Sequence, residues 1–194
     1  VLGVLGVLLY PLSPMALTST IYTFDISLSD ADRGVYEDLS IRAARHPSET
    51  DEFLWTRVLA YCLEYEEGIG FSKGVSDGDE PAISVRDPAG RYRAWIEVGA
   101  PDADRLHRGA KAADRVAVYS TREWHSLRRQ LEGKRIHRGA EIPFYVLDQD
   151  LLRELVSLLD RRMSLSLSRT GGQLYLDLAG RSLTGGVEEY RLEG

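Results

Sequence analysis

The chain has 194 residues, of which 43% are hydrophobic and 28% are charged. This length and balance are typical of one globular domain with a buried core, and they exclude a disordered or fibrous chain. The formal net charge of −6 argues against a protein that binds nucleic acid or anionic membranes over its whole surface. The single cysteine, Cys62, excludes an internal disulfide and a cysteine-based zinc site.

The first fourteen residues, VLGVLGVLLYPLSP, form an apolar run that is too short to span a bilayer as a helix. No Lys or Arg precedes this run, and no small-x-small cleavage site is obvious, as a secretory signal would require. We therefore expect residues 1–14 to be an extension outside the fold, with Met15 as the natural start of one domain over residues 15–194. A true signal or anchor is the alternative. Because one cysteine suits a reducing compartment, the expected location is the cytoplasm, away from membranes.

Hydrophobic periodicity predicts the elements in chain order. Residues 18–30 alternate between apolar and polar side chains, as in a strand with one buried face, and residues 39–43 alternate again to complete a hairpin. After Pro47, the segment Ser48-Glu49-Thr50-Asp51 has the form of a helix N-cap, and an apolar stripe continues to near Glu66. The remaining predicted elements are a hairpin within residues 76–99, helices over 102–113, 121–132 and 148–159, and strands over 116–119, 142–147, 163–168, 174–178 and 187–192.

The resulting order is ββ-α-ββ-α-β-α-β-α-βββ, without a repeat or a linker. It predicts an α/β (α+β) fold, in which one compact domain has a mixed sheet with flanking helices.

The hairpin within residues 76–99 brings acidic residues together. Its turn, Asp87-Pro88-Ala89-Gly90, has the residue types of a type I turn. A simple four-residue turn sets Glu80 opposite Glu97, and one bulged residue sets Asp79 opposite Glu97 instead. In either register a carboxylate lies within about 6 Å of Glu97, the usual cross-strand distance. Two carboxylates this close are the minimal site for a hard cation such as Mg²⁺.

Glu97 is the most informative of these residues. Acidic residues at strand ends usually point into solvent, which is the simpler interpretation of the cluster. Glu97, however, lies in Ala94-Trp95-Ile96-Glu97-Val98, a mostly apolar strand of the kind that is buried in a sheet. A charge in such a strand is costly unless it is paired or bound to a metal.

Several segments resemble the YaeQ family of bacterial proteins, and they follow in order from Met15 to the C-terminus. They are MALTSTIY (15–22), ARHPSETDE (44–52), DEPA (79–82) and WIEVG with the following PD (95–102). The resemblance implies a variant of the PD-(D/E)XK restriction-endonuclease-like fold. It further implies that Asp79 is the Asp of that motif and Glu97 its second acidic residue. Either Glu49 or Glu52 is similar to the helical Glu that many such enzymes add as a metal ligand.

One position departs from that motif. The Lys expected two residues after Glu97 is replaced by Gly99. The helix over residues 102–113 offers Arg105, His107, Arg108 and Lys111 as other sources of a cationic group. Because arginine does not easily lose its proton, Lys111 is the candidate for the missing catalytic lysine.

The distribution of charge adds a candidate surface for a polyanion. Residues 101–140 contain ten Lys and Arg against five Asp and Glu, a local balance of +5, while the rest of the chain carries −11. Arg105 and Arg108 are candidates for contacts with phosphate, and Trp124 is a candidate for stacking on an exposed base. A solvated basic helix face explains the same charges equally well.

Together, these features predict a nuclease-like protein that acts on phosphodiester bonds of DNA or RNA. Its Mg²⁺ or Mn²⁺ would be held by Asp79, Glu97 and Glu80, with Glu49 or Glu52 as a further ligand. The alternative is a non-catalytic module that binds nucleic acid or protein on a degenerate nuclease scaffold. The chain is expected to be a monomer or a weak homo-oligomer.

Overall fold

The computed structural model describes residues 18–72 and 80–192. Both Asp79 and the predicted extension over residues 1–14 lie outside the described residues. No helix in the described ranges is long and apolar enough to cross a membrane. In chain order the elements are β1 (Thr20–Asp30), β2 (Val35–Arg45), α1 (Asp51–Leu63), β3 (Ile69–Phe71), β4 (Ile83–Arg86), β5 (Tyr92–Val98), α2 (Ala103–Ala112), β6 (Arg115–Ser120), α3 (Trp124–Leu131), the 3₁₀ turn η1 (Gly139–Glu141), β7 (Pro143–Leu147), α4 (Gln149–Ser157), β8 (Arg162–Thr170), β9 (Gln173–Leu178) and β10 (Arg181–Arg191).

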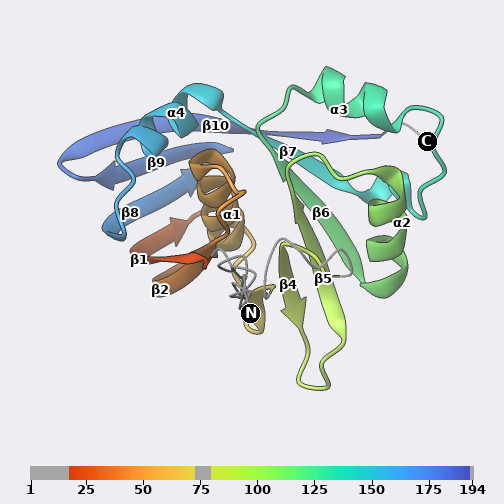
Figure 1. Ribbon diagram of the computed structural model, residues 1–194, viewed down its shortest axis with the longest axis horizontal. Helices are drawn as coiled ribbons and strands as arrows, with labels where there is room; N and C mark the ends of the chain where they lie inside the picture. Colours follow the sequence, from red (N-terminus) through yellow and green to blue (C-terminus); the bar gives the residue numbers. More distant parts are fainter. Residues whose placement is uncertain (1–17, 73–79, 193–194) are drawn as a thin grey trace, which may run out of the picture.

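All ten strands belong to one mixed sheet, in the order β2-β1-β8-β9-β10-β7-β6-β5-β4-β3. Strands β1 and β8 are parallel, as are β5, β6 and β7, whereas the other neighbours are antiparallel. The first part of β10, Arg181–Gly186, pairs with β9, and its second part, Val187–Arg191, pairs with β7. One long strand therefore joins two half-sheets, which splay apart in Figure 1.

Helix α1 lies between the two half-sheets (Figure 1). It contacts β2 and α4 on one side and β3, β5 and β6 on the other. Nine of its 13 residues are buried, and the ring of Trp55 packs edge-on against Phe24 at 5.1 Å between centroids. Such a helix has apolar residues all round because every face meets protein. The N-cap lies within the predicted segment Ser48-Glu49-Thr50-Asp51 and is Thr50, whose side chain accepts a hydrogen bond from the Phe53 N–H.

Helices α2 and α3 cover the outer face of β5, β6 and β7 (Figure 1). Trp95, Val118 and Phe144 point into this outer layer and pack with Leu106 of α2 and Leu127 of α3. The residues between them on the strands point to the inner core around α1. Strand β5 is therefore buried on both faces, which explains the nearly continuous apolar run around Glu97.

The predicted class is confirmed as a mixed α+β domain with flanking helices. Several boundaries differ from the prediction, including the start of α3 at Trp124 instead of Thr121, and three differences concern the sheet most. Strand β2 begins at Val35, β3 lies in a segment predicted to be a loop, and β10 begins at Arg181 instead of Val187. The early part of β10 contains Gly185-Gly186, a pair that indicates a turn when only local sequence is considered.

The predicted register of the β4–β5 hairpin is wrong. The turn itself is present, because the Gly90 N–H donates to the Asp87 carbonyl at 2.8 Å. Gly90 has a φ of +81°, however, and adds a bulge residue after the type I turn. A second shift occurs between Val85 and Arg86. The pairing ends at Ile83 opposite Ile96, so that Glu97 does not face Glu80 across the ladder.

Replacing the bulge glycine gives a test of this turn. We expect Gly90→Ala to lower the free energy of unfolding by about 1 kcal/mol, because an L side chain is disfavoured at positive φ. An added Cβ would meet no atom within 4 Å, so the effect is conformational rather than steric. Urea unfolding measures it. Gly70→Ala in β3, also in open space but at an ordinary φ, is the control and should be neutral or slightly stabilising.

Candidate functional site

A pocket of about 500 Å³ lies where the parallel strands β5 and β6 end. The segments that follow the two strands form one side of it, and the first turns of α1 form another. Carboxyl ends of neighbouring parallel strands are a common place for ligand sites, because loops and helix ends converge there. The charged residues that line this pocket are Glu52, Arg57, Glu80, Glu97, Arg105 and Arg122.

Glu97 lines the pocket although only 2% of its surface is exposed. Its Oε1 accepts hydrogen bonds from Trp95 Nε1 at 2.6 Å and from Arg105 Nε at 2.7 Å. Its Oε2 makes no hydrogen bond to the described residues, which leaves this oxygen available to a ligand. The carboxylate is thus fixed through one oxygen and open through the other.

Opposing effects act on the pKa of Glu97. Burial raises the pKa above its ordinary value, because the charged form loses its hydration. The hydrogen bonds and positive charge of Arg105, and the Trp95 N–H, act in the other direction. Asp102 adds a small upward contribution through its negative charge. The net result is a raised pKa, with Arg105 as the main group that favours the ionised form.

Helix α2 positions Arg105. Its N-cap residue, Asp102, accepts a hydrogen bond from the Arg105 N–H at 2.7 Å, and this sets the first turn. The Arg105 side chain then bonds Glu97 and also donates from Nη2 to the Glu80 carbonyl at 2.6 Å. Arg105 was predicted to contact substrate. The structure places it in the pocket wall, where it links β5 to the segment before β4.

Arg57 contributes to the pocket from α1, and its side chain is only 4% exposed. Its Nε lies 2.7 Å from Glu49 Oε1, and its Nη2 donates to the Ala44 carbonyl at 2.7 Å. Burial lowers the pKa of Arg57, and the Glu49 carboxylate opposes that shift. Glu49 also accepts from the His46 N–H at 3.0 Å. Of the two candidates expected on the first helix, Glu52 lies on α1 and lines the pocket, whereas Glu49 precedes the helix and pairs with Arg57.

The structure brings some of the other predicted site residues to the pocket and leaves others away from it. Glu80 lines the pocket, with its Oε1 3.5 Å from Arg86 Nη2. Arg108 and Lys111 lie exposed on α2 and are not among the lining residues. Trp124 stacks on Tyr190, with ring centroids 5.1 Å apart, so that one of its faces is already occupied.

Gly99, at the position of the motif lysine, has a φ of +93°. A Cβ there would lie 3.3 Å from Cε2 of Phe53. A lysine at this position would therefore be strained and would press on α1. In residues 18–72 and 80–192, no three His, Cys, Asp or Glu side chains form a group that could hold a metal ion.

Sequence reasoning missed two cationic lining residues, Arg57 and Arg122. Arg122 comes directly after β6, where a loop residue next to a buried parallel strand is a signal for a site. Arg57 lies one helical turn after Phe53, among apolar residues, and a charged residue on such a face is the signal.

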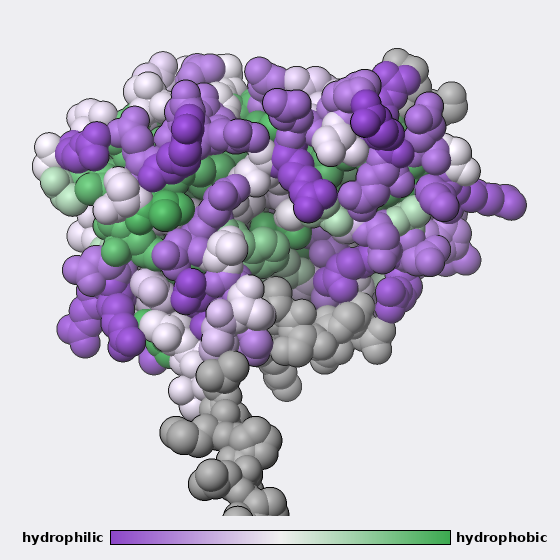
Figure 2. All heavy atoms as spheres, turned by 45° about the horizontal axis from the view of Figure 1, so that its top comes forward, coloured by the Kyte–Doolittle hydropathy of each residue, from purple (hydrophilic) through white to green (hydrophobic). Residues whose placement is uncertain are grey.

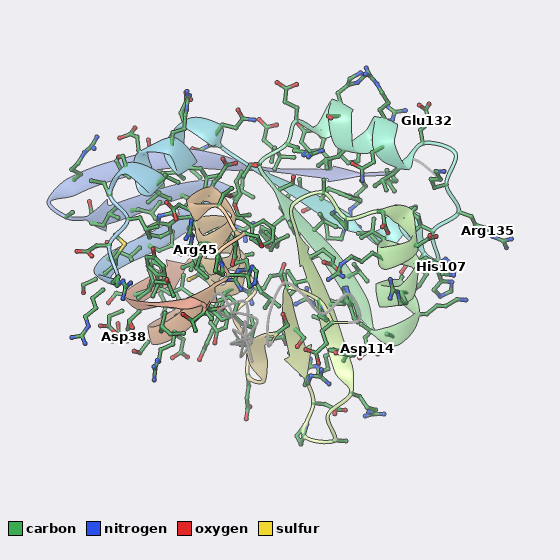
Figure 3. All side chains as sticks on the ribbon, in the orientation of Figure 1. Asp38, Arg45, His107, Asp114, Glu132 and Arg135 are labelled. Carbon is green, nitrogen blue, oxygen red and sulfur yellow. The ribbon has the colours of Figure 1, made fainter. Side chains whose placement is uncertain are left out.

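Helices α2 and α3 and the loop after α3 carry a basic surface, which we define as Arg108, Lys111, Arg128, Arg129, Lys134 and Arg135, all exposed. Figure 2 shows hydrophilic side chains gathered over this side of the molecule, and in Figure 3 Arg135 projects outward from the loop after α3. Two other arginines of the region have structural roles. Arg115 pairs with Glu64 and Glu66, and Arg138 donates to three carbonyls at the end of α2.

Comparison with known proteins gives a consistent result. A family model described as "YaeQ protein" matches residues 15–185. "Uncharacterized protein YaeQ" of Escherichia coli (strain K12) is 32% identical over 164 residues, which cover 84% of this chain and 90% of that protein. The Salmonella typhi protein of the same description is 33% identical over 171 residues, which cover 87% and 94%.

Two crystal structures are also similar to this chain. The YaeQ protein from Pseudomonas syringae has a TM-score of 0.80 and 30% identity, with 90% of this chain and 97% of that chain covered. The YaeQ protein from Xanthomonas axonopodis pv. citri has a TM-score of 0.82 and 28% identity, with coverages of 91% and 100%.

Proposed function

The chain belongs to the YaeQ family, and from this premise we propose that its pocket binds a phosphodiester group of DNA or RNA together with Mg²⁺ or Mn²⁺ and hydrolyses it. The observation that carries the proposal is the charge of the pocket, which is lined by three glutamates and three arginines. A phosphate without a cation would be repelled by the carboxylates, and a cation without a phosphate would be repelled by the arginines. A phosphate that arrives with a divalent cation complements both sets.

The donor chemistry fits such a cation. Mg²⁺ takes oxygen ligands and is usually held by one or two carboxylates, with water and substrate phosphate completing its coordination. Glu97 would hold it through the open Oε2, while Glu80 and Glu52 line the same pocket without forming a three-carboxylate group with Glu97 among the described residues. Asp79, which the family resemblance implies as a further ligand, lies outside the described residues. When bound, the ion would polarise a phosphate oxygen and lower the pKa of a bound water.

The residues of the chain itself prepare the site in this proposal. Arg105 favours the ionised form of Glu97 in a buried position, and Trp95 fixes the direction of that carboxylate. Arg122, exposed at the pocket, would receive the phosphate group. The basic surface on α2 and α3 would attract the rest of the nucleic acid by a salt-dependent interaction. Lys111 has no place in the pocket under this proposal. A buried free cysteine fits a reducing cytoplasm as the compartment.

A second candidate is a module that binds nucleic acid without cleaving it. Two observations favour it: Gly99 replaces the motif lysine, and Arg105 already pairs with Glu97. The same pocket would then recognise the phosphate backbone, and the bound strand would remain intact.

One experiment separates the two candidates. Labelled single-stranded DNA, single-stranded RNA and duplex DNA are incubated with the protein and Mg²⁺, Mn²⁺ or EDTA. Binding is measured by anisotropy and cleavage on gels. We expect cleavage with either metal and none with EDTA, because the cation is needed to offset charge at the phosphate. Glu97→Gln should abolish cleavage, while Glu132→Gln, an exposed carboxylate at the end of α3, should leave it unchanged (Figure 3).

Binding without cleavage in both metals would establish the second candidate instead. Failure of all three substrates to bind or to be cleaved would refute both. A thermal melt with metal alone adds a direct reading, since a ligand at 100 times its Kd stabilises a protein by about 2.7 kcal/mol.

A further inference from the structure

The guanidinium group of Arg57 is held rigidly inside the pocket wall. Glu49 binds its Nε, the Ala44 carbonyl binds its Nη2, and the ring of Phe71 lies 5.3 Å from its central carbon. These contacts come from three separate segments: the turn before α1, the end of β2, and β3. A planar group fixed at its edge and face has little freedom to turn, so the direction of its remaining nitrogen is set.

That remaining nitrogen, Nη1, makes no hydrogen bond to any residue in the described ranges. Arg57 nonetheless lines the pocket, and its side chain is 96% buried. Unlike Nε, Nη1 is not among the fully buried side-chain atoms that lack a hydrogen-bond partner, so a ligand or water in the pocket can reach it and accept from it. Glu97 Oε2 on β5 is the complementary case, since it is an acceptor open to the same pocket.

We infer that Arg57 is an anion-binding residue of the pocket, which donates from Nη1 to a non-bridging oxygen of the bound phosphate. The inference rests on the proposed function for the identity of the ligand, and it assigns the recognition of that ligand to α1. Two groups that line the same pocket then act together, Arg57 from α1 and Glu97 from β5. Arg57 receives the anionic oxygen, and Glu97 receives the cation that accompanies it.

The arrangement differs from a purely structural ion pair. For a purely structural role, the contacts with Glu49, Ala44 and Phe71 would suffice, and Nη1 of Arg57 would not need a partner in the pocket. An anion-binding role uses Glu49 only to hold Arg57 in place. Removing Glu49 and removing Arg57 therefore break the same ion pair, yet only the second change removes the donor that faces the pocket.

The test compares Glu49→Gln with the double variant Glu49→Gln/Arg57→Gln. The double variant leaves no unpaired charge at this position, which limits the loss of stability. Inorganic phosphate is titrated by calorimetry, and the labelled oligonucleotides are titrated in parallel. We expect Glu49→Gln to retain phosphate affinity within about threefold of the wild type. The double variant should lose at least about tenfold, the loss typical of a hydrogen bond to a charged group.

The outcomes keep the two proposals apart. Equal affinity in the two variants would overturn the role of Arg57, whereas retained cleavage of oligonucleotides by the wild type would leave the proposed function standing. Arg57-dependent binding of phosphate, without binding or cleavage of any oligonucleotide, would support the anion site and refute the proposed function. If either Gln variant does not fold, Arg57→Lys keeps the charge but loses the fixed fork. It should weaken phosphate binding at least about tenfold, and wild-type affinity in this variant would overturn the role.

Discussion

Arg105→Ala is expected to lower the free energy of unfolding at pH 8 by about 3 kcal/mol, because it leaves the buried carboxyl group of Glu97 without its cationic partner. The Glu97 side chain is 3% exposed, while that of Arg105 is 24% exposed. Water therefore cannot replace Arg105 as a partner of the Glu97 carboxylate without entering a buried position. This loss of stability is at the lower end of the range for breaking a buried ion pair, because water reaches part of Arg105. Urea unfolding at fixed ionic strength measures it, with Lys111→Ala on the exposed side of α2 as the control.

The same substitution should have a clear pH dependence. A carboxyl group whose folded pKa is raised above its ordinary value of 4.5 is favourable when protonated. That contribution is complete below pH 4.5 and is lost as the pH rises through the folded pKa. Without Arg105 the folded pKa rises further, so the difference in stability from wild type should be smallest at or below pH 4.5 and largest at pH 8. Glu97→Gln/Arg105→Ala should remove the pH dependence. A loss of equal size at both pH values would contradict this account.

Gly109→Ala is expected to destabilise the protein by about 2 kcal/mol, although the same change stabilises most helices. Alanine is favoured over glycine inside a helix by about 1 kcal/mol. In α2, however, the added Cβ would lie 2.8 Å from Cδ1 and 2.9 Å from Nε1 of Trp95. Overpacking of a tight core costs up to about 3 kcal/mol, so the steric effect exceeds the helix propensity.

The displacement of Trp95 would also reach the pocket. Its Nε1 donates to Glu97 Oε1, and moving the indole would weaken that bond and raise the pKa of Glu97 further. Stability is measured by urea unfolding and the indole by its fluorescence. A double-mutant cycle with Trp95→Leu tests the cause, because Gly109→Ala should be neutral or stabilising once the large ring is absent. Destabilisation of the same size in that background would show that Trp95 is not the origin.

Most elements of the fold follow from local pattern. The alternation through Phe24 and Ile26 predicts β1, and the cap at Thr50 with its apolar stripe predicts α1. Local pattern does not reveal how the elements meet. The position of β10 across both half-sheets depends on tertiary pairing that overrides Gly185-Gly186, and the hairpin register depends on a bulge at Gly90 that simple turn counting does not include.

The sequence pointed most directly to the candidate site where a charge interrupts an apolar strand, and the hairpin, the first helix and the second helix supplied Glu80, Glu52 and Arg105. This reasoning found Glu97, because its neighbours Trp95 and Ile96 mark a strand buried on both faces. It did not find Arg57, whose importance depends on a pocket between α1 and the end of β5, far apart in the chain. It also placed weight on Lys111, which shares a helix with Arg105 but lies at the opposite end of it.

The place of β1 between β2 and β8 has a consequence for how the chain is made. The partner strand for residues 23–30 of β1 is residues 162–169, which leave the ribosome much later. At ordinary rates of translation the delay is on the order of ten seconds. Throughout that interval the growing polypeptide carries an unpaired strand edge next to the side chains of Phe24, Ile26 and Leu28. Chains that terminate prematurely before β8 would retain this unpaired, aggregation-prone strand edge. They should therefore depend on chaperones to remain soluble.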